Sequence, residues 1–273
     1  MGRRIVATGR GGTGKSTFVA LAARYLDPPI LLIDLDPDQS LADMVGADLE
    51  REKVATISGA LNSLVQERKR SPQPGSMALP ERMAYLVQVD CLYESEAFDL
   101  VTLGTKLTEG CYCAPDNVLR TVIPELAKNY TNVLIDSPAG LEHLNRKVFS
   151  DVDDLFVILD PSLKSIRHVE RVKAIAREIG ISYAHLYLVG NHRFNEGLEK
   201  HVSRIAGASY LGRIDYDARV EEFNLHGRSL LELPDESPAC LSVKGVLGRA
   251  SRELAQRQGQ VILSYNMWQD STE

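Results

Sequence analysis

The sequence predicts an α/β fold in which one doubly wound, mainly parallel sheet is flanked by helices. Two observations predict it: apolar runs of strand length recur along the chain, and segments with helical spacing alternate with them. Strand–helix alternation produces right-handed β-α-β units and therefore a parallel sheet. The chain has 273 residues and shows no internal repeat or clear linker, so we expect a single domain over residues 1–273.

The strand candidates are short apolar runs, several of which end at a polar residue or a glycine. Residues 29–33 read Pro-Ile-Leu-Leu-Ile and lead directly into Asp34. Continuous runs of this length are typical of parallel strands that are buried on both faces. In chain order, we expect strands over residues 4–8, 29–33, 98–103, 132–136, 155–160, 185–191 and 210–212.

The helix candidates show apolar residues at helical spacing. Ile57, Ala60, Leu61 and Leu64 follow this spacing and predict a helix over 56–69. A longer amphipathic segment over 162–179 is followed by Gly180, a residue that commonly ends helices. The prolines, glycine and serines of 69–76 predict a loop. Further helices are expected over 18–23, 80–92 and 238–260.

Residues 9–17 read Gly-Arg-Gly-Gly-Thr-Gly-Lys-Ser-Thr and lie between the first predicted strand and the first predicted helix. This is the pattern and context of a phosphate-binding loop, whose backbone N–H groups surround an anion at a helix N-terminus. Lys15 would contact the β- and γ-phosphates, and the Ser16 hydroxyl would bind Mg²⁺. The motif therefore predicts binding and hydrolysis of a nucleoside triphosphate. The predicted binding residues of the loop are Gly11, Gly12, Thr13, Gly14, Lys15, Ser16 and Thr17.

Bulk composition excludes several classes of partner. The formal net charge of −6 argues against a general nucleic-acid binder, which usually carries a basic surface. No apolar stretch is long enough to span a bilayer, so no membrane partner is expected. The chain begins Met-Gly-Arg-Arg and enters its first strand at once, without the pattern of a signal peptide. A cytoplasmic location is expected, where four cysteines are thiols or metal ligands rather than disulfides.

Cys111 and Cys113 form a Cys-x-Cys pair flanked by Gly110 and by Ala114-Pro115. Two thiolates do not complete a tetrahedral site, but a twofold dimer would supply four sulfurs from two chains. Such a set suits Zn²⁺, an iron–sulfur cluster or Ni²⁺. The alternative is a buried or merely reactive pair, which is how we interpret the isolated Cys91 and Cys240.

The loop also has a positively charged residue near its beginning, because Arg10 precedes Gly11-Gly12. This resembles the deviant Walker A motif, K-G-G-x-G-K-[ST], of the MinD/ParA/nitrogenase-iron-protein superfamily. The resemblance implies that this charged residue crosses a dimer interface and contacts the partner's phosphates. Arginine replaces the superfamily's lysine here; it keeps the charge and adds a fork of donors. The alternative is a solvated loop arginine.

The same resemblance assigns further residues. Asp36, in Asp-Leu-Asp-Pro, matches switch I and would activate the attacking water, with Asp34 near the metal. Asp136, at the end of an apolar strand, matches the Walker B aspartate that holds Mg²⁺ through water. Asn191 matches the asparagine that reads the adenine edge, which favours ATP over GTP. Any one aspartate taken alone would be interpreted as a cap or turn residue. Together with the loop, at the expected order and spacing, the functional role is favoured for Asp36 and Asp136. The residues assigned to catalysis are Lys15, Asp36 and Arg10.

Three segments together resemble the CooC-type nickel-insertion ATPases, which mature carbon monoxide dehydrogenase or acetyl-CoA synthase. They are Leu103-Gly104, Glu109-Gly110-Cys111-Tyr112-Cys113, and Ala139-Gly140-Leu141-Glu142-His143-Leu144. Two departures are Arg10 in place of lysine, and Ser137-Pro138 where many members have threonine and glutamate. His143 would lie in switch II, where a switch or packing role is expected rather than metal ligation.

The resemblance implies an ATPase metallochaperone that binds ATP/ADP and Mg²⁺ and dimerises on nucleotide. Ni²⁺, or Zn²⁺ in its place, would be shared across the dimer by Cys111 and Cys113. The client would be a nickel enzyme of the carbon monoxide dehydrogenase or acetyl-CoA synthase type. Two alternatives stay open: a MinD/ParA-like positioning ATPase, and an Mrp-type iron–sulfur carrier, although carriers of that type use Cys-x-x-Cys.

Overall fold

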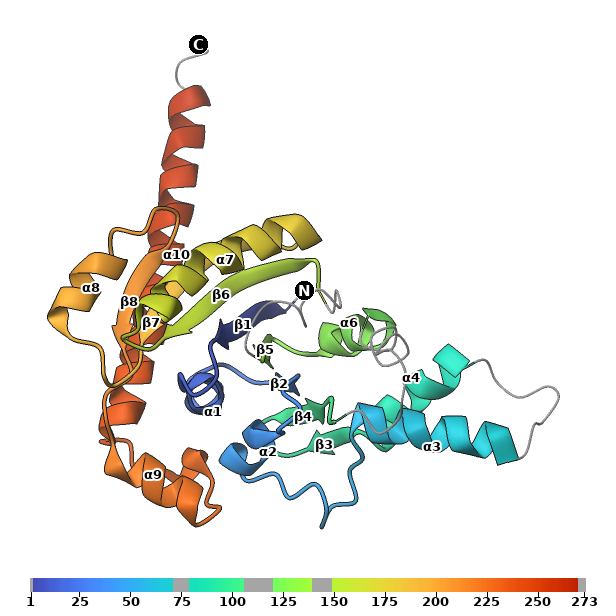
Figure 1. The fold of residues 1–273 in the computed structure, drawn as a ribbon. Coiled ribbons are helices and arrows are strands. Elements are labelled where there is room, and N and C mark those ends of the chain that lie inside the picture. The colour runs from blue at the N-terminus through green and yellow to red at the C-terminus, as the bar shows by residue number, and fades with distance from the viewer. Residues whose placement is uncertain (1, 71–78, 106–119, 139–148, 270–273) are drawn as a thin grey trace.

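The computed structural model describes residues 2–70, 79–105, 120–138 and 149–269. Within these ranges eight strands form one sheet, in the spatial order β3-β4-β2-β5-β1-β6-β7-β8 (Figure 1). All neighbouring strands are parallel except β3 and β4, which are antiparallel. The predicted α/β fold class is thereby confirmed. The strands are β1 Arg3–Gly9, β2 Ile30–Asp34, β3 Leu92–Glu94, β4 Asp99–Thr102, β5 Asn132–Asp136, β6 Asp151–Leu159, β7 Ser182–Gly190 and β8 Ser209–Arg213.

Helices cover both faces of this sheet (Figure 1). Side chains of β1 alternate between two hydrophobic clusters, with Val6 in one and Ile5 and Ala7 in the other. The cluster that contains Val6 packs against α3, α4, α6, α7 and α8, and the other packs against α1, α2, α9 and α10. The helices are α1 Lys15–Ala23, α2 Ser40–Val45, α3 Ile57–Arg70, α4 Leu79–Val89, α6 Ile123–Leu126, α7 Leu163–Ile179, α8 Glu196–Val202, α9 Ala218–Leu225 and α10 Pro238–Gln269.

The central strands are buried on both faces, which is why they read as continuous apolar runs. Every residue of β2 and β5 is buried, including the polar residues at their ends. β1 lies between β5 and β6. The chain leaves β1 toward β2 on one side, and after it crosses from β5 to β6 it continues to β7 and β8 on the other side, so the direction of winding reverses beside β1. Ligands of doubly wound sheets bind at the carboxyl edge beside such a switch point. The fold therefore places the phosphate-binding loop after β1 where a ligand is expected.

The sequence misplaced some boundaries and missed the shortest elements. The helix expected over 80–92 ends at Val89, and the next three-residue segment from Leu92 is the antiparallel strand β3. β6 begins at Asp151, four residues before the strand expected from 155, because its first half alternates exposed and buried residues. Helices α2, α6, α8 and α9 were not expected; each has eight residues or fewer.

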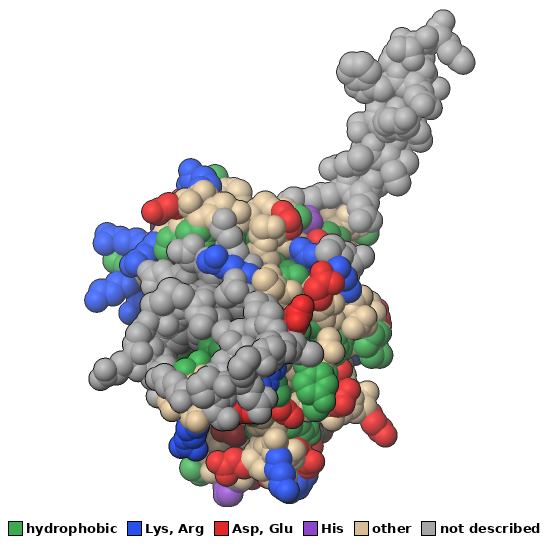
Figure 2. All heavy atoms as spheres, turned by 90° about the vertical axis from the view of Figure 1, so that its right-hand side faces the viewer, with side chains coloured by type: hydrophobic (Ala, Val, Ile, Leu, Met, Phe, Trp, Pro, Cys, Tyr) green, Lys and Arg blue, Asp and Glu red, His purple; other side chains and the backbone are tan. Residues whose placement is uncertain are grey.

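The surface of the described residues carries mixed charge. In Figure 2, basic and acidic side chains are both spread over the coloured part of the face shown. Within the described ranges, no helix is both long and apolar enough to pass through a membrane.

Candidate nucleotide-binding site

The phosphate-binding loop is shaped by two glycines in the left-handed region. Gly12 has φ 73° and Gly14 has φ 95°, conformations that favour glycine because a Cβ atom would be strained there. A Cβ built on Gly11, Gly12 or Gly14 would meet nothing within 4 Å, so space lies open over the loop. The loop begins where β1 ends and leads directly into α1. This open cradle at a helix N-terminus fits a phosphate group.

Hydrogen bonds within the loop fix the position of the Lys15 ammonium. The Thr13 hydroxyl donates to the Arg10 carbonyl oxygen over 2.8 Å, and the Thr13 N–H donates to the same oxygen over 3.3 Å. The Lys15 ammonium lies 3.5 Å from that oxygen, and Lys15 is buried. With one carbonyl oxygen as its hydrogen-bond partner in the described chain, the Lys15 charge is available to an anion.

Two acidic residues end neighbouring strands beside the loop. Asp34 of β2 and Asp136 of β5 are register partners, and both are 0% exposed. Burial, and then the nearby charge of Asp136, raises the pKa of Asp34 to about 8. Burial likewise raises the pKa of Asp136 to about 6, although the Ser16 hydroxyl and the Lys15 ammonium oppose the rise. Parallel pairing thus brings two carboxyl groups from distant parts of the chain to one point.

Asp136 is the buried acid that the protein leaves unsatisfied. Among the described residues, neither of its carboxylate oxygens has a hydrogen-bond partner. The Ser16 hydroxyl accepts a hydrogen bond from the Ser40 hydroxyl over 3.2 Å, and the Ser16 side chain lies beside Asp136. Carboxylate and hydroxyl oxygens are donors that Mg²⁺ prefers, and a divalent cation would offset the buried charge. The residues therefore fit a Mg²⁺ ion held by Ser16 with Asp136 nearby.

Asp34 organises the segment that carries Asp36. One Asp34 oxygen accepts a hydrogen bond from the Asp36 N–H over 2.9 Å, and the other accepts from the Leu41 N–H over 3.3 Å. Asp36 itself is half-buried, and its carboxylate accepts from the Asp38 N–H over 3.2 Å. The two aspartates thus have different surroundings: Asp34 holds the turn, and Asp36 lies nearer the surface, where water has access.

Arg10 contacts its own chain in this structure. Its guanidinium donates to the Ser162 hydroxyl over 3.2 Å and lies 3.6 Å from the Asp160 carboxylate. Ser162 is the N-cap of α7, so these contacts place Arg10 beside the end of β6. The Arg10 side chain is 41% exposed, which leaves its guanidinium accessible at the surface.

A cavity of about 170 Å³ extends from the phosphate-binding loop to the ends of β7 and β8. Asn191 lies in its wall, as expected for the base-reading residue. The Asn191 side-chain oxygen accepts a hydrogen bond from the Arg193 N–H over 3.0 Å, which orients the amide. The cavity is lined by Gly12, Thr13, Gly14, Thr17, Asn191, His192, Ile214, Asp215, Tyr216, Asp217, Val220, Glu221 and Ala239.

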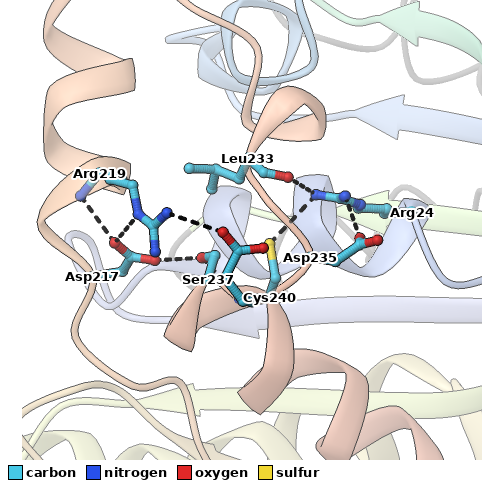
Figure 3. Close-up of polar contacts among 8 residues, drawn as sticks. Arg24, Asp217, Arg219, Leu233, Asp235, Ser237 and Cys240 are labelled. Carbon is cyan, nitrogen blue, oxygen red and sulfur yellow. Dashed lines mark hydrogen bonds and ion pairs between the residues drawn. The ribbon is translucent and has the colours of Figure 1, made fainter.

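Polar contacts join the outer wall of this cavity to α10 and α1 (Figure 3). The Asp217 carboxylate accepts hydrogen bonds from the Ser237 hydroxyl and from the Arg219 N–H, the latter over 3.0 Å. Arg24, directly after α1, pairs with the Asp235 carboxylate at 2.5 Å and donates to the Leu233 carbonyl oxygen. Helix α1, which follows the phosphate-binding loop, is thus held to the segment 233–237. The same segment contacts Asp217 in the cavity wall.

Some predicted residues lie outside the described ranges, namely Cys111, Cys113 and His143. Within those ranges, no group of three or more His, Cys, Asp or Glu side chains is arranged to hold a metal ion. Cys91 and Cys240 are buried thiols, in agreement with their structural interpretation.

Sequence reasoning missed several residues of the site. Ser40, Asp160 and Ser162 contact predicted residues, and the segment 214–217 forms much of the cavity wall. Apart from Ser40, which begins α2, they share one signal: each lies within four residues after the end of a strand at the carboxyl edge of the sheet. The strand order needed to use that signal came only with the structure.

Comparison with known proteins places the chain in a family. A model of the CobQ/CobB/MinD/ParA nucleotide-binding domain matches residues 4–230. An uncharacterised ATP-binding protein of Methanocaldococcus jannaschii is 31% identical over 248 residues, which are 89% of this chain and 96% of that protein. The carbon monoxide dehydrogenase accessory protein CooC of Rhodospirillum rubrum is 29% identical over 246 residues, which are 87% and 91% of the two chains.

The fold agrees with this placement. The cell division ATPase MinD of Pyrococcus furiosus superposes with a TM-score of 0.66, covering 92% of this chain and 99% of that chain at 20% identity. The domain match, the sequence relatives and the shared fold lead to one conclusion: this chain belongs to the CobQ/CobB/MinD/ParA family of nucleotide-binding domains.

Proposed function

We propose that this protein is an ATP-hydrolysing metallochaperone that dimerises on nucleotide and inserts nickel into a client enzyme of the carbon monoxide dehydrogenase or acetyl-CoA synthase type. Its similarity to a carbon monoxide dehydrogenase accessory protein over most of both chains supports the client class. The Cys-x-Cys pair at Cys111 and Cys113 supports a thiolate metal site.

The described residues support specific roles in ATP hydrolysis. The buried Lys15 would contact the β- and γ-phosphates, which carry the negative charge in the transition state. The half-buried Asp36 would orient the attacking water. Bound Mg²⁺ would neutralise phosphate charge. Ser16 would hold that ion directly, and the unsatisfied Asp136 would balance its charge nearby. In this arrangement Asp34 binds no substrate; it positions the turn that carries Asp36.

One observation links the nucleotide site to the cysteine pair: the strands that lead to each are paired. β4, which precedes the cysteine segment, is parallel to β2, which carries Asp34 at its end. The Leu103 N–H donates to the Asp34 carbonyl oxygen over 2.8 Å. A shift of the turn that carries Asp36 would therefore act, through one backbone hydrogen bond, on the chain entering the cysteine segment.

Nucleotide-dependent dimerisation would complete the metal site. Arg10 would exchange its contacts with Asp160 and Ser162 for the partner's phosphates. A twofold axis would then bring two Cys111/Cys113 pairs together as four thiolates around one ion. Because ATP and metal would act on the same dimer, each would change the affinity of the other by the same factor.

Equilibrium binding of Ni²⁺ and Zn²⁺ to the purified protein, without nucleotide and with ADP or a slowly hydrolysed ATP analogue, tests this function. We expect about half an ion per chain and an affinity that depends on the nucleotide. Iron with labile sulfide would instead indicate a carrier of the Mrp type. Absence of stoichiometric metal in every nucleotide state would indicate a positioning ATPase of the MinD/ParA kind and would refute metal insertion.

A further inference from the structure

Tyr216 presents a large aromatic ring in the wall of the nucleotide cavity. The residue is 54% exposed, although the neighbouring Ile214 and Asp217 are buried. Its ring lies 5.5 Å from that of His192, between centroids, and the two planes are inclined by 56°. Both residues line the cavity. The inclined rings therefore form two sides of an aromatic corner that opens on the cavity.

The Tyr216 side chain is held in this position before any ligand arrives. Its hydroxyl donates a hydrogen bond to the Glu221 carboxylate on α9 over 3.2 Å. The Asp215 N–H donates to the Ser242 hydroxyl of α10 over 3.0 Å, and the Asp217 carboxylate is bonded to Ser237 and Arg219 (Figure 3). Contacts on both sides of Tyr216 thus fix its backbone, which reduces the entropy lost when a ligand orders the ring.

The direction of a bound nucleotide follows from the two ends of the cavity. Gly12, Thr13 and Gly14 lie at one end, where backbone N–H groups and the α1 N-terminus attract phosphate. Asn191, His192 and Tyr216 lie at the other end, at the carboxyl ends of β7 and β8. A nucleotide whose phosphates occupy the loop therefore extends its base toward the aromatic corner.

We propose that the Tyr216 ring is the platform on which the purine base of the nucleotide stacks, with the inclined His192 ring at the edge of the base. Every base has a π-face, so stacking adds affinity without distinguishing one purine from another. Discrimination between adenine and guanine falls to Asn191, whose amide is oriented by the Arg193 N–H. Tyr216 thus contributes affinity for either purine base, and Asn191 contributes the preference between adenine and guanine. The proposal rests on the ATP-binding part of the function above and not on metal.

Equilibrium binding to three probes separates these roles: Mg²⁺–ATP, Mg²⁺–GTP and tripolyphosphate, which has no base. We expect Tyr216→Ala to weaken ATP and GTP by the same factor, about tenfold, and to leave tripolyphosphate binding unchanged. Tyr216→Phe keeps the ring and should bind ATP within about threefold of the wild type, the factor attributable to the lost hydroxyl hydrogen bond. Tyr85→Ala is the matched control, because Tyr85 is 60% exposed on α4 and lies outside the cavity.

The possible outcomes are distinguishable. ATP affinity of Tyr216→Ala within twofold of the wild type would refute the platform, as would an equal loss for tripolyphosphate, which would indicate damage to the phosphate site. A wild-type protein that binds tripolyphosphate but gains no affinity from a base would also refute it, while leaving phosphate binding intact. A wild-type protein that binds none of the three probes would refute the proposed function as well.

Discussion

Asp34 and Asp136 lie opposite each other at the carboxyl ends of β2 and β5, and both are completely buried. Their surroundings are unequal. Asp34 accepts two backbone hydrogen bonds, whereas neither oxygen of Asp136 has a partner among the described residues. Strand pairing thus places beside the phosphate-binding loop one acid that holds a turn and one that lies near the Ser16 hydroxyl and the Lys15 charge.

This pair predicts that the nucleotide-free protein loses stability as pH rises. The folded-state pKa values of about 8 for Asp34 and about 6 for Asp136 lie above the ordinary value of 3.8. Between pH 4 and 8 the folded state therefore binds more protons than the unfolded state, so the free energy of unfolding falls with pH. The slope is at most about 1.4 kcal/mol per pH unit for each carboxyl group.

Urea denaturation at several pH values measures this slope. Asp34→Asn should flatten the part between pH 6 and 8, because the group that titrates there is removed. Asp38→Asn, at an exposed carboxylate two residues beyond Asp36, should leave the slope unchanged. A nucleotide-free protein whose stability rises from pH 5 to 8 would contradict the assigned protonation of the pair.

Asp36→Asn should separate ATP binding from hydrolysis. The amide keeps the shape of the side chain and its acceptor for the Asp38 N–H, but it cannot accept a proton from water. We expect ATP affinity near that of the wild type, a hydrolysis rate lowered by about 10²-fold or more, and an accumulated ATP-bound dimer. Rapid-quench hydrolysis assays and sedimentation check this. Wild-type turnover in Asp36→Asn would remove the assignment, with Asp38→Asn again as the control.

Cys111→Ser and Cys113→Ser should each abolish stoichiometric metal binding and leave ATP binding intact. In a symmetric dimer each substitution removes two of four thiolates, so the remaining pair cannot complete the site. Cys91→Ala is the control, because Cys91 is a buried thiol whose pKa is raised to about 12 by burial, which disfavours the thiolate. Metal analysis after dialysis is the measurement. Unchanged metal affinity in either serine variant would show that no shared site exists.

Arg10→Ala should bind ATP as a monomer and fail to dimerise on it. The loss of the guanidinium removes the charge that we expect to reach the partner's phosphates, and hydrolysis should fall with it. Arg10→Lys should restore much of both, because it keeps the charge. Arg51→Ala removes an equally positive side chain that is 74% exposed and should change nothing. Sedimentation with a slowly hydrolysed ATP analogue decides: a normal dimer from Arg10→Ala means that Arg10 acts only within its own chain, on Asp160 and Ser162.

The elements predicted from sequence were those with strong local signals. Continuous apolar runs predicted the central strands, and the spacing over 162–179 predicted α7 within a residue, from Leu163 to Ile179. β3 has three residues and pairs only with β4, so its strand conformation depends on a distant neighbour. The site followed the same division. The phosphate-binding loop is local and was predictable, whereas Tyr216, which follows β8, reaches the cavity only because β8 pairs with β7 and brings Tyr216 beside His192.

By itself the sequence predicted which residues would carry chemistry: the glycines, Lys15 and Ser16 of one contiguous loop, and aspartates placed at the ends of apolar runs. These features are encoded locally, because the loop motif and each apolar run consist of consecutive residues of the chain. Only the tertiary structure decided which strand ends meet. The order of parallel strands brings Asp34 opposite Asp136, and it brings the Leu103 N–H into a hydrogen bond with the Asp34 carbonyl oxygen. Such pairings join residues far apart in sequence, and they form only when burial of both sheet faces offsets the entropy of closing the chain.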